Sequence, residues 1–93
     1  MSGKRSDIEI SSDILKVTLN GAKKSHIVYK ANLNFQLGKK YVDHLMSCGL
    51  IRGPSDLDKT FYTTARGVEF IKYFEGIKEY LGPENTVAKS GEE

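Results

Sequence analysis

The sequence predicts a winged helix-turn-helix, a mainly α-helical fold of the α+β class, with a long C-terminal helix that forms a coiled-coil dimer. Residues 25–51 favour two helices joined by a tight turn that contains asparagine. A strand pair follows, because dense turn residues at 53–56 separate two apolar runs. The last helical segment carries apolar residues at coiled-coil spacing. Two linked helices and a hairpin are the frame that presents one helix to the major groove of DNA.

The first helix is predicted over residues 6–19 and serves as scaffold. Ser6 or Asp7 can cap its N-terminus, because their side-chain oxygens accept hydrogen bonds from free backbone amides. Asn20 and Gly21 end it, since both tolerate the left-handed backbone that follows many helices. Apolar residues recur at helical spacing along its inner face: Ile10, Ile14 and Val17.

The second helix is predicted over residues 25–31, with Ser25 as its cap. A two-residue turn follows, and Asn34 caps the third helix, which runs to Cys48. The inward residues of the second helix are Ile27, Val28 and Ala31. The third helix is the best candidate for a recognition helix, because its two faces differ sharply.

One face of this third helix is apolar and the opposite face is polar and basic. The apolar face contains Leu37, Gly38, Tyr41, Val42, Leu45 and Cys48. The polar face contains Gln36, Lys39, Lys40, Asp43 and Ser47. Glycine inside a helix costs roughly 1 kcal/mol relative to alanine, so Gly38 predicts a close approach by a crossing helix. Cys48 predicts a buried structural thiol, with a reactive thiol as the alternative.

Two short strands, residues 50–52 and 60–63, are predicted to form a hairpin, the wing. Thr64 caps the last helix, which runs to Leu81 before a glycine and a proline stop it. The following residues, 82–93, have almost no apolar content and are predicted to be disordered. The chain therefore reads as one domain, residues 1–81, followed by a tail.

The last helix also predicts a dimer. Its apolar residues are spaced four, three and four apart, as in the seam of a coiled coil: Phe70, Phe74, Ile77 and Leu81. A domain this small has little surface left to cover the outer part of that stripe. A homodimer is the prediction, and a helix packed along its own domain is the alternative. Spacing alone leaves parallel and antiparallel pairings open.

Charge is unevenly distributed along the chain. Residues 1–66 carry eleven Lys and Arg against six Asp and Glu, whereas residues 67–93 carry three Lys against six Glu. A basic body is expected where one surface meets phosphates, although a well-solvated surface would look similar. No apolar run is long enough to span a membrane and the N-terminus does not resemble a signal peptide, so the prediction is a cytoplasmic protein without a membrane partner.

Catalysis is not predicted. The two histidines, His26 and His44, have no local sequence typical of a nucleophile, and no phosphate-binding glycine loop is present. Their spacing matches no standard metal site, and a single cysteine excludes both a disulfide within the chain and a cysteine-rich zinc site. The prediction includes no metal, no cofactor and no small-molecule substrate.

Double-stranded DNA is the predicted partner. Gln36 can read adenine, and Lys39 or Lys40 can reach guanine or phosphate from the same face. Other basic residues surround the helix pair or flank the wing and suit phosphate contacts: Lys23, Lys24, Lys30, Arg52 and Lys59. Asn34 is first a cap and second a phosphate contact. The acidic wing tip argues against deep insertion of the wing at that point.

The segment IVYKANLNFQLGKKYVDHLMSCGLI, with YTTARGVEFIKYFEGIKEYL after the wing, resembles the small archaeal winged-helix DNA-binding chromatin proteins of the Sulfolobus type. The resemblance covers residues 7–81, and IVYKANLNF is its most specific part. It implies an antiparallel coiled-coil dimer through the last helix. It also implies nucleoid-associated binding of DNA with little sequence preference, through Lys30, Gln36, Lys39, Lys40 and Arg52.

Two other functions remain open at the level of sequence. Asp43 lies on the reading face, and the chain is less basic than a chromatin protein usually is, so a sequence-specific transcriptional regulator is the alternative. Some winged helices bind proteins through the third helix or the wing, and the mixed charges of this wing would suit that role.

Overall fold

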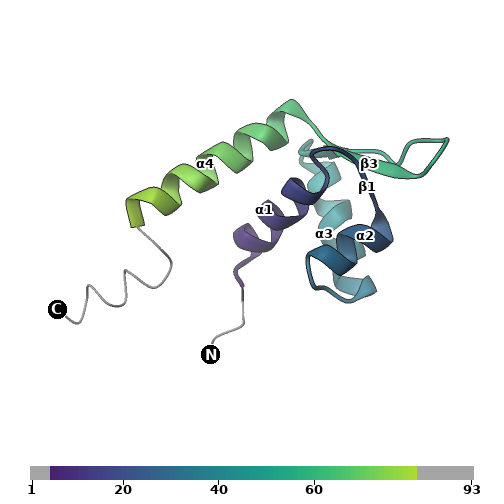
Figure 1. The fold of residues 1–93 in the computed structure, drawn as a ribbon, viewed down its shortest axis with the longest axis horizontal. Helices are drawn as coiled ribbons and strands as arrows, with labels where there is room; N and C mark the ends of the chain where they lie inside the picture. Colours follow the sequence, from purple (N-terminus) through teal and green to yellow (C-terminus); the bar gives the residue numbers. More distant parts are fainter. Residues whose placement is uncertain (1–4, 82–93) are drawn as a thin grey trace.

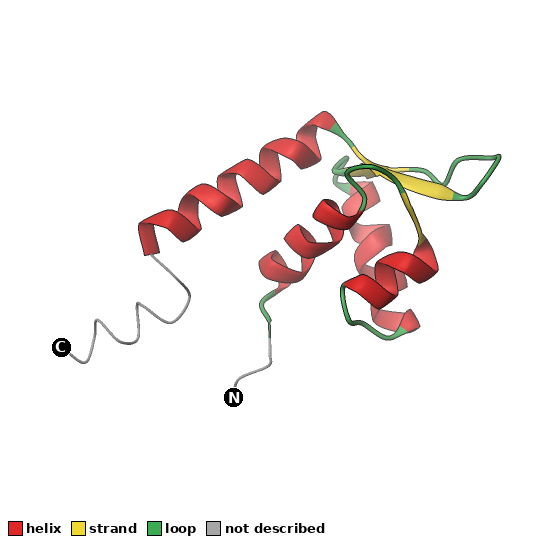
Figure 2. Ribbon diagram, viewed as in Figure 1, coloured by secondary structure: helices red, strands yellow, loops and turns green. Residues whose placement is uncertain are grey.

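The structure, a computed structural model, describes residues 5–81 of the 93-residue chain. It has the predicted winged helix architecture, with helices around one core and a small antiparallel sheet (Figure 2). The predicted tail, residues 82–93, lies outside the described residues. In chain order the elements are α1 (Asp7–Val17), β1 (Ala22–Lys23), α2 (Lys24–Lys30), α3 (Phe35–Ser47), β2 (Ile51–Arg52), β3 (Thr60–Thr63) and α4 (Ala65–Leu81).

The core lies where α1, α2 and α3 meet the sheet. Nearly every part of the fold contributes at least one side chain to it, which is what a small domain needs in order to bury enough apolar surface. The fully or almost fully buried members are Ile14, Leu15, Ile27, Ala31, Val42, Leu45, Ile51 and Phe61. The predicted inward faces of the first two helices are therefore largely confirmed, with Ile10 and Val17 only partly buried at the margin.

The helix starts follow the predicted caps, with one exception. Ser6 caps α1 and forms a reciprocal capping box with Glu9. Asn34 caps α3, and its side-chain oxygen accepts a 2.8 Å hydrogen bond from the amide of Leu37. The prediction that Ser25 caps α2 is wrong, because the helix begins one residue earlier and Lys23 occupies the cap position without a side-chain bond.

Gly38 is the point where α2 and α3 cross closely, as its position inside a helix predicted. A Cβ atom at this position would lie only 2.5 Å from the Cγ2 atom of Val28. The missing side chain thus allows the two helices to pack at short range. This contact fixes how α3 is presented on the surface of the domain.

The sheet has three strands in the order β1-β3-β2, whereas the sequence predicted only the two wing strands. Ala22 pairs with Phe61, and Lys23 pairs with Thr60, so the segment before α2 is bonded to the wing. On the other side, β2 and β3 form the predicted hairpin through Ile51 and Thr63. The extra strand joins the wing directly to the helix-turn-helix unit.

α4 leaves the sheet on the side opposite the wing tip and runs beside α1 (Figure 1). Thr64 caps it as predicted, since its hydroxyl accepts a hydrogen bond from the amide of Gly67 at 3.1 Å. A 2.5 Å ion pair between Lys16 and Glu75 links the two helices and lowers the pKa of the Glu75 carboxyl. None of the helices in residues 5–81 is both long and apolar enough to cross a membrane.

Candidate nucleic-acid interface

The outward face of α3 is polar, basic and exposed. Gln36, Lys39 and Lys40 all lie on it with exposed side chains. The opposite side of the helix faces the core through Gly38, Val42 and Leu45, which are buried. This arrangement agrees with the two opposite faces that the sequence predicted for the middle of the helix. It leaves the Gln36 amide and the Lys40 ammonium group exposed to solvent.

The two lysines of α3 differ in their surroundings. Lys39 forms a 2.8 Å ion pair with Asp43 one helical turn further on. The hydrogen bond from Lys39 is the main reason that the pKa of the Asp43 carboxyl lies below its usual value, and the charge of Lys24 contributes further. Among the described residues Lys40 makes no ion pair, so its charge is the more available of the two.

The basic residues of α2 do not form one group with α3. Lys23 and Lys24 lie at the start of α2, and the electrostatic effect of Lys24 on Asp43 indicates that this end is near α3. Lys30 lies at the other end and lines a shallow hollow with His26 and residues of α1. Of these three lysines, Lys23 and Lys24 are therefore the better placed beside the reading face.

Arg52 is held in place by its neighbour across the wing. Its guanidinium lies 4.9 Å from the centre of the Tyr62 ring, and the two residues are paired between β2 and β3. Such a cation–π contact orients the group and keeps its charge at the surface. Lys59 is exposed at the end of the loop, with a positive φ of 58°.

The wing loop is closed on itself by hydrogen bonds. The backbone amide of Ser55 donates to the carbonyl of Thr60 at 3.0 Å, and the amide of Lys59 donates to the carbonyl of Ser55 at 2.9 Å. The hydroxyl of Ser55 donates to Asp58, and this bond is the main cause of the lowered pKa of that carboxyl. The tip is thus an ordered turn with a negative charge, between basic residues at its two ends.

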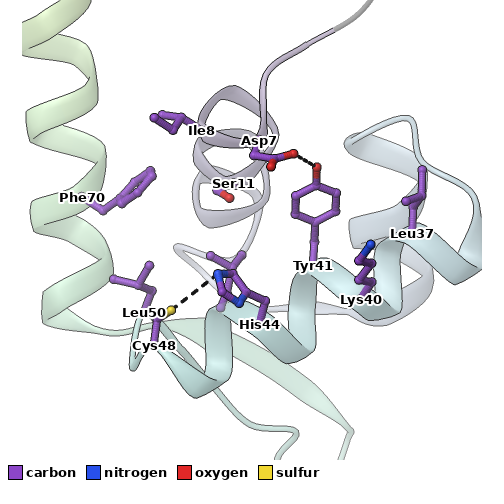
Figure 3. Close-up of a pocket in the computed structure, with 11 residues that line it drawn as sticks. Asp7, Ile8, Ser11, Leu37, Lys40, Tyr41, His44, Cys48, Leu50 and Phe70 are labelled. Atoms are coloured by element: carbon purple, nitrogen blue, oxygen red, sulfur yellow. Dashed lines mark hydrogen bonds between the residues drawn. The ribbon is translucent and has the colours of Figure 1, made fainter.

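One flank of α3 does not lie where the sequence predicted. Leu37 and Cys48 were expected to face the core, yet Leu37 is 41% exposed and Cys48 is also exposed, so the prediction of a buried thiol is wrong. The helical angle was correct, but no other element within residues 5–81 covers this flank. These residues line an open groove of about 450 Å³ between α1, α3 and the start of α4 (Figure 3).

This groove, called here the α1/α3/α4 groove, is mainly apolar. Its apolar lining consists of Ile8, Leu37, Tyr41, Leu45, Cys48, Leu50 and Phe70, and polar or charged groups are contributed by Asp7, Ser11, Lys40 and His44. The hydroxyl of Tyr41 donates a 2.5 Å hydrogen bond to Asp7, which raises the pKa of the tyrosine. The Sγ atom of Cys48 lies 3.8 Å from the Nε2 atom of His44. No sequence pattern predicted this groove, because its walls come from three separate segments.

The residues of the predicted stripe on α4 differ in exposure. Phe70 and Phe74 are half-buried, Phe70 against the core, whereas Ile77 is 57% exposed. The side chain of Leu81 lies outside the described part. Two further aromatic residues extend the exposed side of the helix, Tyr73 at 71% and Tyr80 at 92% exposure, and the sequence analysis had not included them.

Within residues 5–81 no three side chains of His, Cys, Asp or Glu are grouped so that they could hold an ion. What the site offers instead is a row of hydrogen-bonding and cationic groups on a convex helix, flanked by a basic wing base. This is chemistry for recognising phosphates and base edges.

The chain belongs to the winged helix-turn-helix family, which matches residues 4–81. Its structure is similar to the crystal structure of Sso10a-2, a DNA-binding protein from Sulfolobus solfataricus, with a TM-score of 0.78 and 22% sequence identity. The match covers 95% of this chain and 92% of that one. No curated protein matches the sequence significantly. The two matches confirm the resemblance to small archaeal winged-helix proteins, and at this identity the structural match establishes the fold.

Proposed function

We propose that this protein binds double-stranded DNA as a homodimer, with α3 in the major groove and the base of the wing against the backbone. The observation that carries the proposal is the exposed outward face of α3, where Gln36 and Lys40 stand opposite a buried apolar side. A glutamine amide can pair with adenine, and a lysine can reach guanine or phosphate. The DNA-binding activity of the structurally similar Sso10a-2 supports the same partner.

The wing and the start of α2 supply the backbone contacts in this proposal. Arg52, Lys59, Lys23 and Lys24 lie on either side of the reading helix in sequence and are charged donors suited to phosphate oxygens. Asn34 primarily caps α3, and Lys30 contacts DNA only at the edge of the interface, if the duplex bends toward α2. The acidic tip near Asp58 stays clear of the phosphates.

The dimer part of the proposal rests on α4. Ile77 and the neighbouring tyrosines leave an apolar strip in solvent on a helix that continues beyond the core. A second copy presenting the same strip would cover it with a self-complementary interface. Two reading helices on one particle then add avidity, which supplies affinity that a chain with a net charge of only +2 lacks.

We assign the protein a chromatin role with little sequence preference, in the cytoplasm at the nucleoid. Few side chains of α3 are positioned to read bases, and most candidate contacts are lysines, which bind phosphates irrespective of sequence. A sequence-specific regulator is the second candidate. The ion pair between Lys39 and Asp43 favours it, because a carboxylate on the reading face penalises non-specific contact with phosphates and can accept a hydrogen bond from cytosine.

A salt series distinguishes these roles. Fluorescence anisotropy on a random duplex and on genomic fragments, with unlabelled competitor DNA, gives affinity at several salt concentrations. The chromatin role predicts a steep fall in affinity with salt and equal competition by all duplexes. A regulator would keep a preferred site at high salt, with an affinity well above that for random DNA. Absence of binding to any duplex at low salt would contradict both.

A further inference from the structure

The α1/α3/α4 groove has the size and composition of a small-molecule binding site. Ligand pockets typically have volumes of about 300–1,000 Å³, mostly apolar walls and a few converging polar groups. The groove has a volume of about 450 Å³, its walls are mainly apolar, and its polar groups come from α1 and α3. Lys40 is the one residue that its described lining shares with the predicted DNA contacts. A ligand in this groove would therefore meet the reading helix at that lysine.

The charge at the rim of the groove favours an anionic ligand. Lys40 stands beside Tyr41 on α3 (Figure 3) and forms no ion pair within the described part of the chain. Asp7 is the only acidic residue among the described lining residues, and it already accepts a 2.5 Å hydrogen bond from the hydroxyl of Tyr41. A carboxylate would thus find a free partner in the ammonium of Lys40, whereas an amine would compete with Tyr41 for Asp7.

The other end of the groove suits an aromatic ring. Phe70 extends into it from α4 (Figure 3), and Ile8 and Leu50 supply aliphatic surface. Aromatic rings pack favourably against a phenyl group in offset or edge-to-face geometry. Eight residues separate Lys40 from Cys48, or about 12 Å along the helix axis. Two fused rings that carry a carboxylate have a similar length, so one ligand can contact both ends of the groove.

We propose that the α1/α3/α4 groove binds a small aromatic carboxylic acid, with its rings against Phe70 and Leu50 and its carboxylate on Lys40. The binding site is independent of DNA binding, whereas its effect on DNA rests on the proposed function. Lys40 cannot give its full charge to the ligand and to a phosphate at once, so the ligand should lower the affinity for DNA. The groove would make DNA binding responsive to the concentration of such an acid.

Naphthoic acid is a suitable probe, with naphthamide as a neutral control of the same shape. In a nuclear magnetic resonance titration of isotope-labelled protein, the acid should shift amide signals of α1, of α3 and of Leu50, and leave the wing loop unchanged. The amide should bind about tenfold more weakly, because it lacks the charge that pairs with Lys40. Naphthylmethylamine, which carries the opposite charge, should bind no better than the amide.

Two pairs of matched variants test the contacts. Lys40→Gln should weaken binding of the acid about tenfold and leave binding of the amide unchanged. Lys39→Gln removes the same charge from a residue that does not line the groove, and it should have little effect. Ile8→Glu places a carboxylate in the groove and should abolish binding of the acid, whereas the neutral Ile8→Gln should weaken it only a few-fold. Ile8 is 56% exposed, so both substitutions should leave the domain folded.

Fluorescence anisotropy at matched ionic strength measures the effect on DNA. Saturating naphthoic acid should lower the affinity for a random duplex about three- to tenfold, as expected for the loss of one phosphate contact. Naphthamide should not lower it. Ile8→Glu should bind DNA like the wild type and should not respond to the acid.

The outcomes separate the inference from the proposed function. Absence of binding at millimolar naphthoic acid, equal binding of acid and amide, or unchanged binding by Lys40→Gln would overturn the inference and leave DNA binding untouched. An affinity for the acid that falls as protein concentration rises would show that a second copy occupies the groove, which also overturns it. Binding in the groove without any effect on DNA would support the site and remove Lys40 from the DNA interface, so that result would contradict the proposed function instead.

Discussion

Lys39 and Lys40 are neighbours on the reading helix, yet only one of them is neutralised within its own chain. The carboxylate of Asp43 lies 2.8 Å from the ammonium of Lys39, whereas Lys40 forms no such pair among the described residues. An exposed pair of this kind contributes little to stability. The pair should affect DNA binding more than stability, because the carboxylate of Asp43 would lie close to the phosphates whenever Lys39 contacts them.

Lys40→Ala should therefore weaken DNA binding more than Lys39→Ala does. Each lost phosphate contact lowers the salt dependence by about 0.9 in slope and weakens binding about three- to tenfold at moderate salt. The double substitution should cost more than tenfold. Fluorescence anisotropy measures the affinities, with Lys72→Ala on α4 as a control of equal charge change. Equal binding by the double variant and the wild type would exclude α3 from the interface.

Asp43→Asn should strengthen binding to random DNA. The substitution frees Lys39 and removes a like charge that faces the phosphates, so affinity should rise about three- to tenfold at low salt and the salt slope should steepen by about one contact. The same gel-shift or anisotropy titration measures both. If binding to random DNA weakens instead, Asp43 accepts a hydrogen bond from DNA, and the sequence-specific regulator becomes the better proposal.

At the scale of elements, the start of α4 packs directly on the chain that precedes the wing. A Cβ atom at Gly67 would lie 2.3 Å from the carbonyl oxygen of Leu50 and 2.5 Å from the Cγ2 atom of Thr63. The carbonyl is backbone and cannot rotate away. Gly76, nine residues further along the same helix, has no atom within 4 Å of such a Cβ position.

Gly67→Ala and Gly76→Ala should change stability in opposite directions. The first should cost about 1–3 kcal/mol, the usual price of an overpacked contact. The second should stabilise the protein by about 0.5–1 kcal/mol, because alanine favours a helix over glycine. Urea unfolding of both variants gives the two free energies. Destabilisation by Gly76→Ala would indicate that a second chain packs closely at that position.

Local patterns predicted those parts of the fold that depend on local chemistry. The cap at Asn34, the close crossing at Gly38 and the cap at Thr64 each follow from a residue type at a given position in a helix. The strand Ala22–Lys23 was not predicted, because a strand of two residues is too short to show the alternation of polar and apolar residues by which strands are recognised. Its partner, β3, begins 37 residues after β1 ends, and only the folded chain brings the two together.

Helical spacing predicted part of the exposure pattern of α3 correctly, whereas the DNA contacts themselves stay a prediction. Helical spacing placed Gln36 and Lys40 correctly on the outward face. The same spacing misplaced Leu37 and Cys48, because it gives the angle of a side chain but not whether another element covers it. Likewise, no sequence pattern distinguished Tyr73 and Tyr80 from other residues of the helix. Their exposure follows from the packing of α4 against α1, which leaves their side of the helix in solvent.

At the scale of the whole molecule, charge and apolar surface are segregated. Residues 1–66, which include α2, α3 and the wing, carry eleven of the fourteen basic residues, and the last part of the chain is acidic. An α4 pair would therefore hold two basic bodies apart, with acidic surface between them. Such a particle meets DNA at its ends, and its middle repels the phosphates.

Ile77→Lys should split the proposed dimer. In a two-fold interface the substitution places two like charges in an apolar seam, which disfavours association. Sedimentation at micromolar concentration should then give the mass of one chain, and DNA binding should weaken strongly although α3 is untouched. Val68→Lys, which adds the same charge on another side of α4, should remain dimeric. A wild-type protein that sediments as a single chain would remove the premise.

The strand β1 has a mechanical consequence for binding. Lys23 is both the last residue of β1 and the N-cap residue of α2, so no loop separates the strand from the helix. Arg52 lies on β2, which is paired with β3, and β3 in turn is paired with β1. The wing is thus connected to α2 and, through the tight crossing at Gly38, to the reading helix, so a contact on the wing would be coupled to the position of α3. In the proposed complex with DNA, the wing would therefore help to set the tilt of α3, and amides along β1 should exchange with solvent more slowly when DNA is bound to the wing.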